Sequence, residues 1–186
     1  MKAKMVNRQH LKINMEAFVM FSKSREWNRI DPRERDVLQR YMGDLPVKLG
    51  AIARELGIEV KLSSLPMNVS GQISRVNDGY EIKINRHESR QRQRFTLAHE
   101  LAHFLLHRDV IDNLGGTLKD NVLYRSGASE KIEFEANRLA AQIVMPEPIL
   151  EEIYKEHGEH LSEGLVEVLA EQFGVSKAAM EIRMAA

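Results

Sequence analysis

Cysteine is absent from this 186-residue chain, and its absence removes two kinds of site. Without cysteine the chain has no disulfides and no thiolate ligands, so a zinc site would need histidine and carboxylate side chains. An excess of charge of one sign is absent too, because Lys+Arg and Asp+Glu both number 27 and the formal net charge is zero. The net charge therefore gives no general attraction to nucleic acid or to a membrane surface.

Long apolar runs are also missing. No stretch approaches the ~20 apolar residues that a membrane-spanning helix requires, and residues 1–27 contain no apolar core of signal-peptide length. A hydrophobic content of 43% and a charged content of 29% are those of a soluble globular protein. We therefore expect a cytoplasmic protein that does not bind membranes.

The most informative feature that is present is His-Glu-x-x-His at residues 99–103, inside an apolar segment from Phe95 to Leu106. Two histidines four residues apart project from one face of a helix and can bind the same zinc ion. Glu100 lies next to them, where it can take a proton from a water molecule. Buried polar side chains on such an apolar helix would need a partner, and a metal would supply it. The motif therefore predicts metal-assisted hydrolysis of a peptide bond.

A catalytic zinc site needs a third protein ligand, and two nearby residues are poor candidates. His107 continues the histidine spacing, but three ligands at i, i+4 and i+8 span ~12 Å along a helix and cannot share one ion. We expect His107 to be a helix-end residue instead. Asp109 lies six residues after His103, but Leu106 occupies the place where some zinc proteases carry a glycine to turn the chain back.

A better third ligand lies on a second predicted helix, at residues 129–146, which Ser129 would cap and Pro146 would end. Glu133 and Asn137 are four residues apart on a face that is otherwise small and apolar. A carboxylate on that face is costly to bury unless it binds a cation, so Glu133 is the favoured ligand. Asn137 could hydrogen-bond the far nitrogen of a liganding histidine and fix its tautomer. Glu135 is the alternative ligand, although we expect it to be solvated.

Several spaced motifs, in this order, resemble the ImmA/IrrE family of zinc metallopeptidases. The resemblance runs from about Leu45 to the C-terminus and rests on residues 69–73, 80–85, 94–107, 133–141, 144–146 and 169–180. One departure is Ala102, which stands where many members have glycine. No sensor domain is expected after the peptidase region, since the chain ends at Ala186.

The resemblance implies one zinc ion bound by His99, His103 and Glu133, with Glu100 as the base and Asn137 behind a ligand. It also implies a partner, because members cut a repressor, usually a helix-turn-helix (Xre-type) protein, in stress response or mobile-element control. Other members belong to toxin–antitoxin pairs. We therefore expect a zinc endopeptidase that cleaves a repressor or antitoxin. The alternative is a toxin or partner-binding component with little peptidase activity.

The pattern along the chain predicts an α+β fold, with a small, mostly antiparallel sheet packed on a helical zincin-like core and helices at the C-terminus. Alternating apolar residues predict strands at 58–62, 71–76 and 80–84, with a hairpin turn at 77–79. We expect three parts: an N-terminal helical segment at 1–44, a zinc peptidase core at 45–160 and a C-terminal helix pair at 161–186.

Three further side chains are candidates for stabilising the oxyanion or contacting substrate: Tyr80, His87 and Tyr124. The basic run at 86–94 is expected to be a solvated lead-in to the active helix, which would begin near Arg94 or Thr96. Residues 109–127 are expected to form a loop with a short strand at 122–125.

The C-terminal helix pair resembles half of a helix-turn-helix motif, with Ile182 expected to be buried. DNA recognition needs basic side chains near the second helix, and only Lys177 and Arg183 are present there, beside Glu181. Direct DNA binding is therefore not expected.

Overall fold

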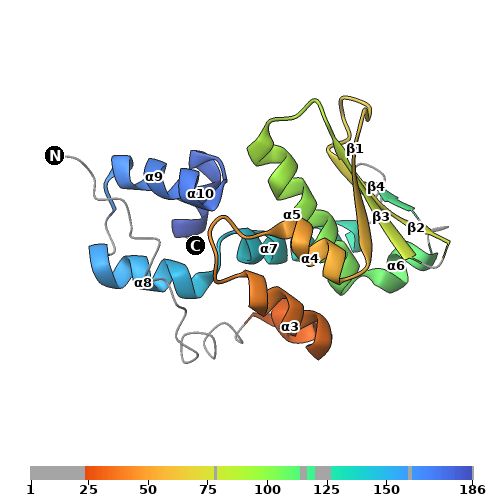
Figure 1. Ribbon diagram of the computed structural model, residues 1–186, viewed down its shortest axis with the longest axis horizontal. Coiled ribbons are helices and arrows are strands. Elements are labelled where there is room, and N and C mark those ends of the chain that lie inside the picture. The colour runs from red at the N-terminus through yellow and green to blue at the C-terminus, as the bar shows by residue number, and fades with distance from the viewer. Residues whose placement is uncertain (1–23, 78, 114–116, 120–126, 159–160, 186) are drawn as a thin grey trace.

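The computed structural model describes residues 24–77, 79–113, 117–119, 127–158 and 161–185. Within these ranges helices and strands follow one another in a mixed order (Figure 1). The elements are α2 (Arg25–Arg29), α3 (Pro32–Tyr41), α4 (Leu49–Glu55), β1 (Ile58–Ser63), β2 (Gly71–Val76), β3 (Gly79–Asn85), α5 (Arg90–Leu106), α6 (Arg108–Asn113), β4 (Thr117–Lys119), α7 (Gly127–Val144), α8 (Glu147–His157), α9 (Glu163–Phe173) and α10 (Lys177–Met184). None of the described helices is both long enough and apolar enough to cross a bilayer.

The four described strands form one sheet in the order β1-β3-β2-β4. β2 runs antiparallel to β3 and to β4, whereas β1 runs parallel to β3. The β2–β3 hairpin closes with Val76 opposite Gly79, and Asn77 adopts the left-handed conformation that a tight turn requires (φ 48°). The predicted α+β fold with a mostly antiparallel sheet is therefore confirmed.

The sheet has one apolar face and one polar face. Ile73 and Ile82 are directly opposite each other on neighbouring strands and are fully buried, and both of these strands contact α5. The opposite face carries charged side chains, among them Glu81, which contacts Lys61 (Nζ to Oε2, 2.5 Å) and Lys83 (Nζ to Oε1, 3.1 Å). This alternation is typical of an antiparallel sheet that covers the core on one side only.

Helix α5 lies between the sheet and α7, and its contact with α7 is the most extensive between any two described elements (Figure 1). Four alanines on the two helices, at 98, 102, 136 and 140, are fully buried. Small side chains at such positions allow helix axes to approach closely. The residues of α5 from Ala98 to Leu105 are all buried, which explains why the helix shows little amphipathic pattern.

The structure corrects the predicted starts of two helices, α5 and α7. Helix α5 begins at Arg90, one turn before the predicted start near Arg94 or Thr96, because the Ser89 hydroxyl caps it by accepting from the Arg92 backbone N–H. The basic run is therefore mostly helix. Helix α7 begins at Gly127, so Ser129 lies inside the helix and is not its N-cap.

Other expectations fall partly outside the described residues. The predicted loop at 109–127 contains helix α6 and the short strand β4. The strand predicted at 122–125 and most of the N-terminal helical segment (residues 1–23) lie outside the described residues, as does Tyr124.

The C-terminal helix pair packs into the same hydrophobic core as α5 and α7. Helix α9 ends at Gly174, which is left-handed (φ 69°), and Ser176 caps α10. Arg94 of α5 joins this region to the body of the protein, because its guanidinium donates to the carbonyls of Val47 (2.6 Å) and Phe173 (3.2 Å). Ile182 was expected to be buried, but the structure leaves it 72% exposed.

Candidate metal centre

Three side chains converge between helices α5 and α7. The Nε2 atoms of His99 and His103 on α5 lie 2.9 Å apart. The Glu133 carboxylate on α7 faces both, at 3.1 Å from His99 Nε2 and 3.4 Å from His103 Nε2. Among the described residues, these three are identified as a group whose ligand atoms could hold one metal ion.

The residues present fit a zinc ion. Ligands held at 2.0–2.1 Å around a tetrahedral zinc lie about 3.3 Å from one another. The three observed separations of 2.9, 3.1 and 3.4 Å bracket that value. Two imidazoles and one carboxylate are also the donor set of catalytic zinc sites that leave a fourth position for water or substrate.

The protonation states of these side chains suit metal binding. Burial lowers the pKa of His103 to about 4, against the opposing hydrogen bond with Glu133, so the imidazole is neutral near pH 7. Burial alone would raise the pKa of Glu133, but its contacts with His103 and His99 outweigh burial and lower it to about 2. A neutral imidazole and an ionised carboxylate are the forms that bind a cation.

The far nitrogen of each histidine also has a partner. His99 Nδ1 lies 3.1 Å from Asn137 Oδ1, one turn after Glu133 on α7. Because an amide oxygen can only accept, Nδ1 carries the proton and Nε2 presents its lone pair to the centre. His103 Nδ1 lies 3.2 Å from His107 Nδ1.

Glu100 is 1% exposed and lies next to His99 on α5. Strand β2 passes very close to it at Gly71, where a Cβ atom would lie 2.9 Å from Glu100 Oε1 and 2.5 Å from Thr96 Cγ2. Only glycine allows the strand to approach this closely. The first residue of β2 therefore forms part of the wall around Glu100.

The other described candidate residues from the sequence lie outside the metal-binding group. The Tyr80 hydroxyl donates to Asp112 (2.9 Å), and its ring packs edge-on against Phe104. His87 is exposed, with Nε2 3.3 Å from the Ser64 hydroxyl. Asp109 is an exposed residue in the first turn of α6 and is not part of the metal-binding group.

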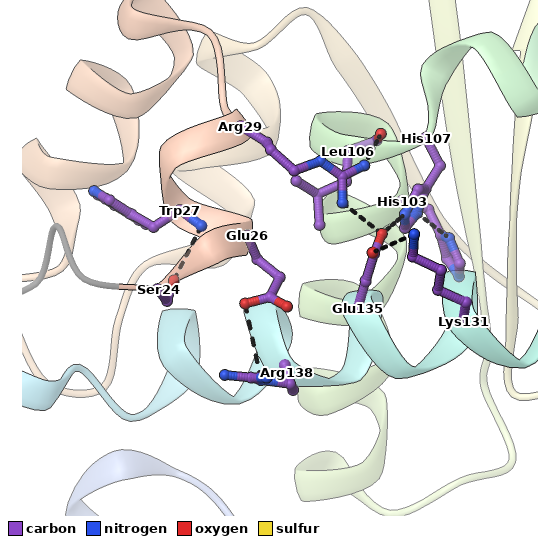
Figure 2. Close-up of polar contacts among 10 residues, drawn as sticks. All are labelled: Ser24, Glu26, Trp27, Arg29, His103, Leu106, His107, Lys131, Glu135 and Arg138. Carbon is purple, nitrogen blue, oxygen red and sulfur yellow. Dashed lines mark hydrogen bonds and ion pairs between the residues drawn. The ribbon is translucent and has the colours of Figure 1, made fainter.

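The sequence did not predict what surrounds His107 and Glu135. His107 follows the last residue of α5, as expected, but its ring is buried between His103 and Glu135 (Figure 2). Glu135 was expected to be solvated, yet its side chain is only 13% exposed and pairs with Arg29 of α2. The i, i+4 spacing of His103 and His107 was the available signal, whereas Arg29 is 106 residues from Glu135 in the chain.

Comparison with known proteins agrees with this geometry. The peptidase family described as the IrrE N-terminal-like domain matches residues 53–185. No curated protein matches the chain.

A solved structure of similar fold is a Mycobacterium tuberculosis transcriptional regulator, with a TM-score of 0.51 and 16% sequence identity. The alignment covers 89% of this chain and 49% of that chain, so this chain spans about half the length of that protein. At this level of identity the likeness concerns the fold alone. The family match covers well over half of the sequence, and the chain therefore belongs to the IrrE N-terminal-like, zinc metallopeptidase-like family, as the resemblance of its motifs to ImmA/IrrE proteins predicted.

Proposed function

We propose that this protein is a zinc-dependent endopeptidase that cleaves a partner protein. The observation that carries the proposal is the convergence of His99, His103 and Glu133, with Glu100 buried beside them on the same helix. When bound there, a zinc ion would polarise the scissile carbonyl and make a water molecule more acidic. The three converging side chains would hold the ion, and Asn137 would keep His99 in the tautomer that binds it.

Glu100 acts as general base and then as general acid in this mechanism. Its carboxylate accepts a proton from the attacking water and afterwards donates that proton to the nitrogen of the leaving amine. Gly71 of β2 lies close against the carboxylate, which restricts where it can move. The proton is returned to the products, so Glu100 ends each cycle ionised.

The proposed substrate is a helix-turn-helix repressor of the Xre type, or an antitoxin, in stress response or mobile-element control. Family membership supports this choice. A repressor substrate would place the reaction in the cytoplasm. Direct DNA binding by this chain is not part of the proposal, because the cation Lys177 of α10 is paired with Glu163 and Glu167.

The test is to incubate the purified protein with the helix-turn-helix repressor encoded nearest to its gene, and to measure intact masses with and without a chelator. We expect two fragments whose masses sum to that of the repressor plus one water, and no fragments when the metal is removed. Glu100→Gln should bind zinc as the parent does and cut at least about 100-fold more slowly.

Two outcomes would count against the proposal. Cleavage by Glu100→Gln at the rate of the parent would show that another group moves the proton. Tight zinc binding and tight repressor binding without any cleavage would favour the alternative, a toxin or partner-binding component of a toxin–antitoxin pair.

A further inference from the structure

A row of polar side chains continues outward from His103, away from the proposed ion. His103 Nδ1 lies 3.2 Å from His107 Nδ1, and His107 Nε2 lies 3.0 Å from Glu135 Oε2 (Figure 2). The row starts on α5, passes through His107, which directly follows α5, and reaches α7 two residues after Glu133. Both imidazoles are buried.

Only one arrangement of protons fits this row when His103 Nε2 presents a lone pair to a cation. His103 Nδ1 must then carry a proton, which it donates to His107 Nδ1. His107 accordingly carries its own proton on Nε2 and donates it to Glu135, because an ionised carboxylate can only accept. Because Glu135 can only accept, His107 must donate to it and must therefore accept from His103. Glu135 thus sets the donor and the acceptor in both hydrogen bonds.

Glu135 is itself held in place by cations. Arg29 Nη1 lies 2.5 Å from Glu135 Oε2, and Lys131 Nζ lies 3.8 Å from Oε1. Arg29 also approaches the Leu106 carbonyl at the end of α5, with Nη2 at 3.5 Å. These contacts leave the carboxylate few other orientations, so that it faces His107.

Helix α2 carries Arg29 and is attached to α7 beside it. The Ser24 hydroxyl donates to Gln142 (3.0 Å), Glu26 lies 3.8 Å from Arg138, and Trp27 is buried in the core. Figure 2 shows two contacts following one another along α7, first Glu26 with Arg138 and then Arg29 with Glu135. The position of Arg29 therefore depends on how α2 packs.

We propose that His107 and Glu135 are positioning residues that hold His103 in its metal-binding tautomer, and that Arg29 of α2 completes this support. The inference rests on the metal site of the proposed function. It assigns the two histidines different supports, since His99 faces the neutral amide of Asn137 whereas His103 is linked through His107 to a carboxylate. Supports of this kind orient a ligand and increase its basicity.

The test measures zinc affinity by competition with a chromophoric chelator, together with the visible absorption spectrum of the Co²⁺-substituted protein. We expect His107→Leu and Glu135→Leu to bind zinc ~10–100-fold more weakly than the parent. Their Co²⁺ spectra should also change, because His103 is no longer held in one orientation. Arg29→Met should weaken binding by a smaller factor, since Lys131 remains beside Glu135.

Conservative and control variants separate positioning from general damage. His107→Gln keeps an amide oxygen that can accept from His103 and an amide N–H that can donate to Glu135, so it should restore most of the affinity. Glu130→Leu alters an exposed glutamate of α7, and Arg25→Met alters an exposed arginine of α2. Both controls should bind zinc within about twofold of the parent, as is usual for surface substitutions.

The inference is overturned if folded His107→Leu and Glu135→Leu keep the affinity and the Co²⁺ spectrum of the parent. If either leucine variant fails to fold, as judged by far-UV circular dichroism, Arg29→Met and Glu135→Ala decide in its place, and parental values in both reject the inference. A parent that binds zinc but cuts no repressor would instead refute the proposed function. The two failures are thus distinguishable.

Discussion

Gly71 is the residue where the sheet comes nearest to Glu100, and the contact leaves no room for a side chain. Gly71→Ala should slow cleavage by about 10–100-fold, because the new methyl group must displace the Glu100 carboxylate, and small misplacements of a catalytic group cost that much. Zinc affinity should stay within about twofold, since His99, His103 and Glu133 keep their places. Cleavage kinetics and chelator competition on the same samples measure both quantities.

Gly50→Ala is the matched control, because a Cβ at Gly50 would meet no atom within 4 Å. It should cut at the parental rate. Equal activity of Gly71→Ala and the parent would mean that Glu100 can move without loss, which contradicts its proposed role as the base.

Acid should destabilise the metal-free protein through His103. Its pKa is lowered from 6.5 to about 4 in the folded state, so the unfolded chain takes up the proton first as the pH falls. The neutral form therefore contributes stability above pH 6.5 that is lost as the pH drops toward 4, up to about 3 kcal/mol. The ionisable groups that face His103 are His99 and Glu133 at its Nε2 and His107 at its Nδ1.

Urea unfolding of the chelated protein at pH 7 and pH 5 measures this loss. His103→Gln cannot take up the proton, so its stability should change less between the two pH values than that of the parent. His157→Gln alters an exposed histidine and should keep the parental dependence. A parental dependence in His103→Gln would assign the pH effect to other groups.

At the scale of residues, local spacing was enough to find part of the centre. Histidines four apart on one helix must share a face, and Glu133 and Asn137 share a face for the same reason. These four side chains do lie together in the structure. The environment of Glu135 could not be predicted, because it depends on Arg29, whose position is set by the packing of α2 and not by local pattern.

At the scale of elements, the centre depends on how closely α5 and α7 approach. Ala140→Leu adds three carbon atoms where the structure has a fully buried methyl group. We expect a loss of about 1–3 kcal/mol in the free energy of unfolding, which is the usual cost of overpacking. Zinc affinity should fall as well, because Glu133 would move away from the two histidines on α5.

Ala178→Leu is the control, since Ala178 is exposed on α10. Its free energy of unfolding, measured by chemical denaturation, and its zinc affinity, measured by chelator competition, should both be close to those of the parent. An Ala140→Leu variant with parental stability and parental zinc affinity would show that the helix interface has room that the structure does not indicate.

Element boundaries were predicted less well than element types. The strands at 71–76 and the hairpin were expected where they are found, because alternating apolar residues flank a turn signal. The start of α5 was placed too late, because a run of basic residues reads as solvated chain and is unfavourable near a helix N-terminus. The cap that overrides it is a single serine, Ser89.

At the scale of the whole molecule, metal removal should lower thermal stability. The proposed ligands come from helices that are far apart in sequence, so the complete set exists only in the folded chain. Zinc in 100-fold excess over its Kd would stabilise the protein by about 2.7 kcal/mol, equivalent to about 5–10 °C in Tm for a chain of this size. Calorimetry with chelator and then with added zinc measures the shift.

Glu133→Ala should lose most of this difference between the metal-free and metal-loaded melting temperatures, while Glu130→Ala should retain it. If zinc raised the Tm of both variants equally, the stabilising ion would bind elsewhere in the chain.

Because the proposed ligands lie on both α5 and α7, zinc binding should affect how fast the protein is degraded in a cell. Without bound zinc the protein unfolds more often, and cellular proteases degrade the unfolded state. We expect its half-life in growing cells, and hence its amount, to rise and fall with zinc supply even when transcription is constant.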